Sequence, residues 1–127
     1  MQKFPAFLIA VALAGSFATA AAAHPELLQA SPAADAVVGG KAKIKLVFSE
    51  KLTPKLSGAT LTMTGMPGMA HHPDMKMTGW SSKVGPDGKS IELVSAKPLP
   101  AGTYRVDWFV VGGDKHRITG KYSFSVR

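Results

Sequence analysis

Apolar and polar residues alternate along several short stretches of this chain. The clearest example is a set of apolar residues two positions apart, separated mostly by lysines: Ala42, Ile44, Leu46 and Phe48. Residues two apart point to the same face of a strand, so this pattern predicts a half-buried strand over 42–48. Similar runs predict strands over residues 58–63, 91–94, 104–111 and 122–126. No stretch of useful length shows the 3.6-residue period of an amphipathic helix.

Turn-forming residues separate these stretches. The segment Pro86-Asp87-Gly88, just before residues 91–94, is one such turn signal. Short strands joined by glycine- and proline-rich turns are typical of all-β Greek-key folds. The pattern therefore predicts an all-β sandwich or small barrel of about seven strands. There are no internal repeats, and no linker is long enough to divide the domain.

The first 23 residues have the features of a secretory signal peptide. Lys3 supplies the positive charge, a mostly apolar run extends from Phe4 to Phe17, and small residues end at Ala23. We expect cleavage after Ala23, which leaves residues 24–127 as one small domain that does not span a membrane. A retained membrane anchor is the weaker alternative. Since the chain contains no cysteine, this exported domain has no disulfide to stabilise it.

The formal net charge of the chain is +7. Its lysines are scattered along the sequence rather than forming a block, and there is no nucleic-acid recognition motif. We therefore do not expect a nucleic-acid partner. A basic surface can attract acidic partners or anionic membranes, but a solvated charged face is the favoured interpretation.

One segment, from Met63 to Met77, holds every methionine except Met1, together with two of the four histidines. Pro67, Gly68 and Pro73 interrupt any regular period there, which predicts an exposed loop. Thioether sulfur is a soft ligand, so methionines and histidines clustered without thiolates favour Cu(I). The alternative is a methionine-rich surface for hydrophobic partners. The segment contains no aromatic residue or leucine between Met63 and Met77 to support that alternative.

A second group of candidate ligands suits Cu(II). Cleavage after Ala23 makes His24 the first residue, so that its α-amine and its ring can chelate one ion. In an extended segment Asp114 and His116 point the same way and can complete that site. Glu50, after a predicted strand, is a candidate weak or orienting ligand. The alternatives are a chance terminal histidine, a turn in which Asp114 caps backbone amides, and an ordinary exposed Glu50.

These motifs, in this order, resemble the CopC copper-resistance proteins over essentially the whole mature chain. The matching segments are His24-Pro25-Glu26-Leu27, Ser31-Pro32-Ala33, Phe48-Ser49-Glu50, Met63 to His71, Ala101 to Trp108 and Asp114 to Gly120. The resemblance implies a periplasmic protein with a cupredoxin-like or immunoglobulin-like β-barrel, which carries copper without doing chemistry on it.

The resemblance also implies two sets of copper ligands. The Cu(II) site would use His24, Asp114 and His116, with Glu50 nearby. The Cu(I) site would use His71 with a subset of four methionines: Met63, Met66, Met69 and Met75. This chain differs from the family pattern in an additional histidine, His72, a second late methionine, Met77, and Arg117 where relatives often carry proline.

Three functions are consistent with these observations. The favoured one is a copper carrier, not an enzyme, that passes copper to an inner-membrane transporter or a multicopper oxidase. The second is a copper oxidase, because an N-terminal histidine with a second histidine also resembles the site of lytic polysaccharide monooxygenases. The third is a secreted immunoglobulin-like module that binds no copper.

Overall fold

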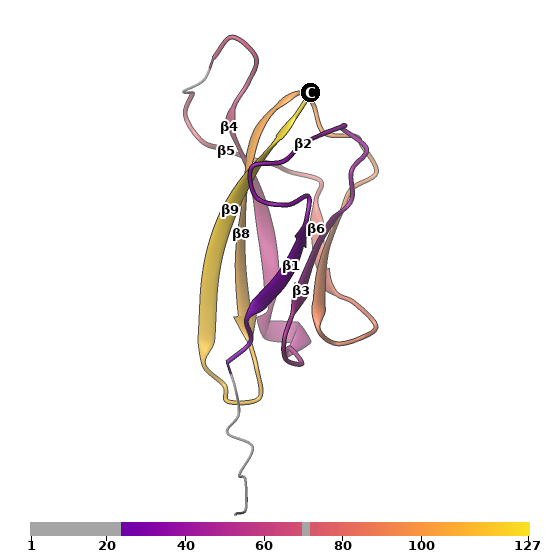
Figure 1. The fold of residues 1–127 in the computed structure, drawn as a ribbon, viewed down its shortest axis with the longest axis vertical. Coiled ribbons are helices and arrows are strands. Elements are labelled where there is room, and N and C mark those ends of the chain that lie inside the picture. Colours follow the sequence, from indigo (N-terminus) through magenta and orange to yellow (C-terminus); the bar gives the residue numbers. More distant parts are fainter. Residues whose placement is uncertain (1–23, 70–71) are drawn as a thin grey trace, which may run out of the picture.

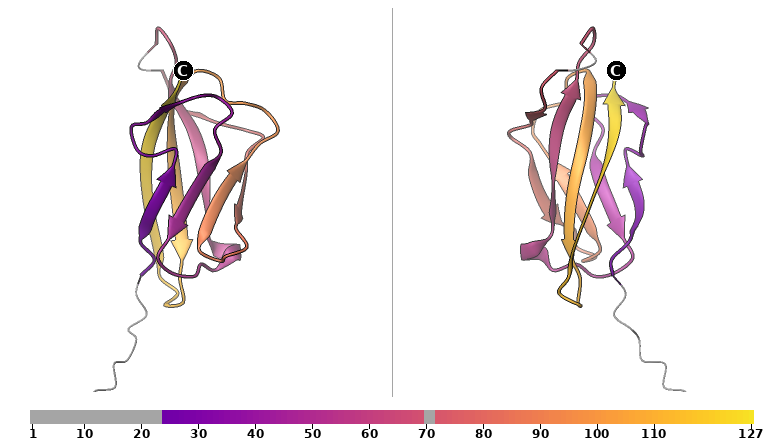
Figure 2. Two further views of the ribbon diagram at one scale, coloured as in Figure 1. Left: turned by 45° about the vertical axis from the view of Figure 1, so that its right-hand side comes forward. Right: turned by 90° about the vertical axis from the view of Figure 1, so that its left-hand side faces the viewer.

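Nine strands in the described part of the chain form two sheets that pack face to face (Figures 1 and 2). The structure is a computed structural model and describes residues 24–69 and 72–127. The predicted signal peptide, residues 1–23, and the candidate ligand His71 lie outside the described residues.

The first sheet has four antiparallel strands in the order β1-β3-β7-β6. Their bounds are β1 Leu27–Ser31, β3 Ile44–Phe48, β6 Ser81–Val84 and β7 Ser90–Val94. The inner face of β3 carries Ile44, Leu46 and Phe48, each at most 1% exposed, while Lys45 between them is exposed and Val47 is half-buried. This is the half-buried strand that the alternating pattern predicts.

The second sheet has five strands in the order β2-β9-β8-β4-β5. Their bounds are β2 Val37–Val38, β4 Gly58–Gly65, β5 Met75–Lys76, β8 Gly102–Val111 and β9 Arg117–Val126. All neighbours are antiparallel except β2, which runs parallel to β9. A single 3-10 turn, η1 (Pro54–Leu56), precedes β4.

The predicted all-β sandwich is confirmed, with differences in its details. The described residues form nine strands rather than about seven, because β2 and β5 are two-residue strands that no pattern marks. The last strand begins at Arg117, five residues before the predicted start at Tyr122. It does so because residues 117–121 pair with β8 in one long hairpin. The described residues contain no helix long and apolar enough to cross a bilayer.

The core lies between the two sheets and is closed by aromatic side chains. Tyr104, Phe48 and Phe124 are its largest fully buried residues. Trp108 on β8 packs edge-on against Phe48, with ring centroids 5.2 Å apart. Its indole also covers Gly120, the directly opposed residue on β9, so closely that a Cβ there would lie 2.1 Å from the ring.

The two predicted groups of ligands lie at opposite ends of this sandwich (Figure 1). Strand β4 leads into the methionine segment at one end, and the β8–β9 hairpin closes the other end. Strand β8 runs between them with ten residues, a span of about 30 Å at about 3.3 Å per residue. No single ion can therefore contact both groups.

The turn between β6 and β7 depends on the charge of Asp87, whose Oδ1 accepts hydrogen bonds from the amides of Lys89 and Ser90 and from the Ser90 hydroxyl. The Lys89 amide, followed by the Ser90 hydroxyl, holds the pKa of Asp87 below its usual 3.8, against the effect of burial. A lowered pKa in the folded state stabilises the fold above the unfolded value of 3.8, and this contribution is lost as pH falls through the folded value. We expect Asp87→Asn to be less stable than the natural protein at pH 7, with the difference shrinking toward about pH 2. Urea unfolding at both pH values measures this, and an equal difference at both would contradict it.

Candidate metal centre

The β8–β9 hairpin holds Asp114 and His116 in a defined turn. The Lys115 amide donates to the Gly112 carbonyl over 3.1 Å, and Lys115 itself has a positive φ of 64°. The His116 amide donates to Oδ1 of Asp114 over 3.2 Å. Because Oδ1 is used within the turn, the other carboxylate oxygen, Oδ2, remains available on the side that faces the N-terminal segment.

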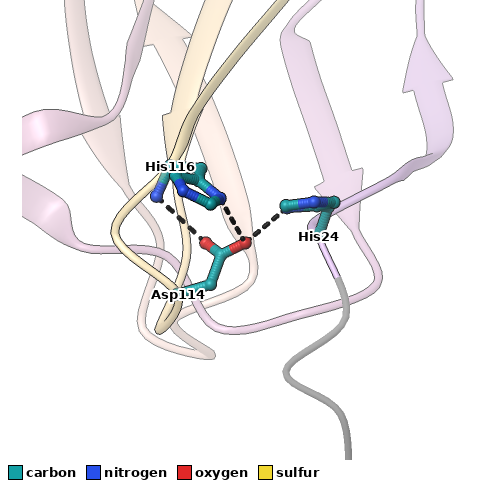
Figure 3. A group of neighbouring side chains, drawn as sticks. All are labelled: His24, Asp114 and His116. Atoms are coloured by element: carbon teal, nitrogen blue, oxygen red, sulfur yellow. Dashed lines mark hydrogen bonds and ion pairs between the residues drawn. The ribbon is translucent and has the colours of Figure 1, made fainter.

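His24, Asp114 and His116 converge at this point (Figure 3). Nδ1 of His24 contacts Asp114 Oδ2, and Nδ1 of His116 lies 3.5 Å from the same oxygen. The two imidazole rings are 5.5 Å apart, and one ligand atom from each of the three residues lies within 4.8 Å of the others. The structure thus brings together three of the four residues that the sequence proposed for this group.

The electrostatics of Asp114 suit a cation. Its side chain is 12% exposed, and Oδ2 is shielded from solvent. Burial raises the pKa of this carboxyl, but the His116 amide and the charges of His24 and His116 outweigh it, so that the pKa lies below the usual 3.8. An ionised carboxylate buried between two imidazoles offers one oxygen and two nitrogens to a metal ion.

Residues that were not among the candidate ligands position His24. Pro25 is fully buried and lies directly on Gly112, where a Cβ would be 2.8 Å from the proline ring. The Glu26 amide donates to Ser49 Oγ over 2.9 Å, and the Ser49 amide donates to the Glu26 carbonyl over 2.9 Å. This N-terminal clamp, residues 25, 26, 49 and 112, fixes the residue that follows the predicted cleavage point. The proline after the histidine and the Gly-Gly pair were the available signals.

The remaining two residues discussed for this end lie outside the group. Glu50 is half-buried and is not among the three residues that converge. Arg117 places its guanidinium 4.7 Å from the ring centroid of Phe109, a cation–π contact on β8. The charge of Arg117 therefore lies over the sheet. Arginine in place of the proline that relatives often carry leaves the three candidate ligands together.

The methionine segment begins with a tight hairpin. The amide of Met66 donates to the Met69 carbonyl over 3.0 Å, and the amide of Met69 donates to the Met66 carbonyl over 2.9 Å. Pro67 and Gly68, whose φ is +80°, occupy the two central positions, as a type II turn requires. Residues that exchange both hydrogen bonds face each other directly, so the turn holds two thioether side chains as neighbours. They are 37% and 53% exposed.

The other methionines differ in burial. Met63, a candidate ligand from the sequence, is 5% exposed and belongs to the hydrophobic core, because β4 extends to Gly65. Met75 on β5 pairs with it across the sheet and is 53% exposed. Met77 is half-buried and packs against the core. The predicted loop is therefore shorter than 63–77, and its ends are paired strands.

Two contacts fix the returning arm of the methionine segment. Arg105 on β8 donates to Asp74 over 2.8 Å and to Asp107 over 2.9 Å, which ties the arm to the sheet. Nδ1 of His72 lies 2.7 Å from the Pro73 carbonyl, and its Nε2 is shielded from solvent with no hydrogen-bond partner in the described residues. When the ring is neutral, donation through Nδ1 leaves the lone pair of Nε2 for a metal ion.

Known proteins are similar to this chain in sequence and in fold. The sequence matches the CopC domain over residues 27–127. It is 53% identical over 112 residues to copper resistance protein C of Escherichia coli, covering 87% of this chain and 86% of that protein. Copper resistance protein C of Xanthomonas campestris pv. juglandis is 50% identical over 120 residues, covering 92% of this chain and 91% of that protein.

Solved structures of copper resistance proteins have a similar fold. The structure is similar to the crystal structure of PcoC, a methionine-rich copper resistance protein from Escherichia coli, with a TM-score of 0.74 and 50% identity. The match covers 83% of this chain and 100% of that chain. CopC from Methylosinus trichosporium OB3b is similar at a TM-score of 0.62 and 26% identity, over 81% of this chain and 93% of that chain.

Proposed function

The chain belongs to the CopC family, and on that basis we propose that it is a periplasmic copper-binding protein of copper resistance. It acts as a carrier, with one site for each oxidation state of the metal. The observation that supports this best is the convergence of His24, Asp114 and His116 from the two ends of the domain sequence. Because the chain contains no cysteine, no thiolate competes with these nitrogen and oxygen donors, which suit Cu(II) at that end of the sandwich.

In the Cu(II) site that we propose, the processed N-terminus is a ligand. Removal of residues 1–23 frees the α-amine of His24 beside its own ring, while the N-terminal clamp keeps both next to Asp114. Two imidazoles, an amine and a carboxylate oxygen form the tetragonal set that Cu(II) favours. Asp114 Oδ2 lies close to Nδ1 of both rings, so it would bind the same ion as these nitrogens and fill a position that an oxidase leaves open. That supports binding without turnover over the alternative of a histidine-brace oxidase, which needs an open position.

In the Cu(I) site that we propose, the thioethers of Met66, Met69 and Met75 bind with a histidine of the same segment. Their exposure supports this choice over Met63 and Met77, which pack in or against the core. His71 is the ligand that the family resemblance implies. Nε2 of His72 is shielded and has no hydrogen-bond partner among the described residues, which supports a role for His72 as well.

Transfer of copper follows from the separation of the two sites. About 30 Å of sheet lies between them, so an ion that changes oxidation state leaves one site before it reaches the other. We propose that each end serves its own exchange partner, an inner-membrane copper transporter or a multicopper oxidase, and that oxidation state selects the end.

The experiment that tests the proposal is a Cu(II) titration followed by EPR on two preparations. One begins at His24 and the other carries one additional methionine before it. We expect the tighter binding, with the nitrogen-rich tetragonal spectrum of a chelate by the His24 amine and ring, only in the first, because the extension turns the His24 amine into a peptide nitrogen and moves the free amine to the added methionine. The Cu(I) affinity of both preparations, measured with a chromophoric competitor, serves as the control and should be equal.

Two results would count against the proposal. Identical Cu(II) spectra and affinities for both preparations would exclude the terminal amine as a ligand. Unchanged Cu(I) binding after joint replacement of Met66 and Met69 by leucine would exclude the hairpin thioethers, since leucine keeps the volume of the side chain and removes the sulfur.

A further inference from the structure

A groove on the outer face of the four-stranded sheet is lined by positive charge. It has a volume of about 550 Å³ and is bordered by the start of β3, the end of β7, strand β6 and the loop after β7. Five lysines and a single acidic residue line it: Lys41, Lys43, Lys45, Lys83, Lys97 and Glu92. We call this the lysine groove.

The strand register explains why the charges gather there. Glu92 on β7 is paired with Lys45 of β3 on one side and with Lys83 of β6 on the other. Only the Lys83–Glu92 pair forms an ion pair among the described residues of the groove, at 3.6 Å, and the Lys83 side chain remains 61% exposed. One carboxylate cannot neutralise five ammonium groups, so the groove keeps a strong excess of positive charge.

Apolar side chains give the lysine groove a second property. Trp80 is half-buried and lines it, and Val94 is 41% exposed at the end of β7. The volume of the groove falls within the range of about 300–1,000 Å³ found for ligand sites. A groove of this size is larger than a single inorganic anion needs. A concave site with an aromatic wall fits an extended chain with acidic side chains better than it fits the flat surface of a bilayer.

The position of the lysine groove relates it to the methionine segment. The loop after β7 leads to the start of β8 at Gly102, and β8 begins opposite Gly65, where β4 ends in the methionine hairpin. Trp80 itself follows β5 by a few residues. Both features therefore lie at the same end of the sandwich (Figures 1 and 2).

We infer that the lysine groove is a docking site for an acidic, extended segment of the protein that exchanges copper with the methionine segment. The purpose of this docking rests on the proposed Cu(I) site, whereas binding of the acidic segment to the lysine groove does not depend on that site. A partner held in the groove would lie at the same end of the sandwich as the exposed thioethers, so that charge attraction would bring the partner's copper site toward them.

The test uses the processed protein, residues 24–127, labelled with ¹⁵N and titrated without copper with a hexaglutamate peptide. We expect saturable NMR shifts at Lys45, Lys83, Val94 and the indole of Trp80. The triple replacement of lysines 43, 45 and 97 by glutamine should weaken binding by at least about tenfold, since it removes three of the five attracting charges. The matched control replaces three exposed lysines outside the groove, Lys51, Lys55 and Lys89, and should bind as the natural protein does.

Other results would overturn the inference. These are the absence of saturable shifts, equal weakening in the two triple variants, or tighter binding to phosphatidylglycerol vesicles than to the peptide through the same lysines. The last result would assign the face to a membrane. Copper binding is measured separately on each variant. Absence of peptide binding by the natural protein, with both of its copper sites intact, would overturn the docking site alone, whereas absence of copper binding in the natural protein would overturn the proposed function.

Discussion

Replacement of Gly112 by valine is expected to weaken Cu(II) binding by about 5- to 150-fold without removing any ligand. A Cβ at this position would lie 2.8 and 2.9 Å from two ring carbons of Pro25, which is fully buried against it. The arm that carries His24 must then move away, or be compressed whenever the ion binds. Overpacking of this kind costs about 1–3 kcal/mol, and each 1.4 kcal/mol corresponds to about tenfold in affinity.

The neighbouring glycine provides the control for this prediction. A Cβ at Gly113 would meet nothing within 4 Å, so Gly113→Val changes the same hairpin without touching the clamp. We expect its Cu(II) affinity, measured by competition titration, to match that of the natural protein. Adding Pro25→Ala to Gly112→Val removes the ring carbons that collide and should recover part of the affinity. Equal affinities for Gly112→Val and Gly113→Val would show that the clamp does not position His24.

Replacement of Gly120 by alanine is expected to destabilise the whole domain. The new Cβ would lie 2.1, 2.5 and 2.9 Å from three indole carbons of Trp108, and that ring is held from another side by Phe48. Trp108 is half-buried and packs against the core, so its rigid ring cannot move away from residue 120 without disturbing its packing with Phe48. We expect a loss of about 2 kcal/mol, and thus a fall in Tm of about 8–16 °C for a domain of this size.

Thermal unfolding followed by circular dichroism measures this effect. Gly113→Ala is again the matched substitution, with an expected change in Tm of less than about 4 °C, because an exposed glycine with free space tolerates a methyl group. Combining Gly120→Ala with Trp108→Leu should give less destabilisation than the sum of the two single changes, since the smaller side chain frees the space over residue 120. Additive effects would place the cause elsewhere.

Much of the fold follows from local patterns in the sequence. The alternation over 42–48 and 104–111 marks strands whose inner residues belong to the core, and the turn signal at 86–88 lies just before β7 as expected. Strands β2 and β5 could not be predicted, since two residues carry no period and pair only because the tertiary fold brings them to an edge. The burial of Met63 could not be predicted from its methionine neighbours either. It follows from the alternation of Met63 with Leu61 on β4.

Some features of the candidate sites can likewise be predicted from the sequence, and others cannot. The ligand types of His24, Asp114 and His116 can be read from the sequence, because the chemistry of each side chain does not depend on the fold. The contact between Pro25 and Gly112 cannot, because it joins residues 87 positions apart through the absence of a side chain. The lysines of the groove also look scattered along the chain, and only the pairing of β3, β7 and β6 gathers them around Glu92.

The convergence of His24 with the β8–β9 hairpin has a consequence for how the domain withstands unfolding. An ion held by His24 and Asp114 would join two points 90 residues apart in a chain with no cysteine. Because the unfolded chain does not hold these ligands together, the free energy of binding would add to the stability of the folded state alone. Copper would then be both the cargo of this protein and its substitute for a disulfide.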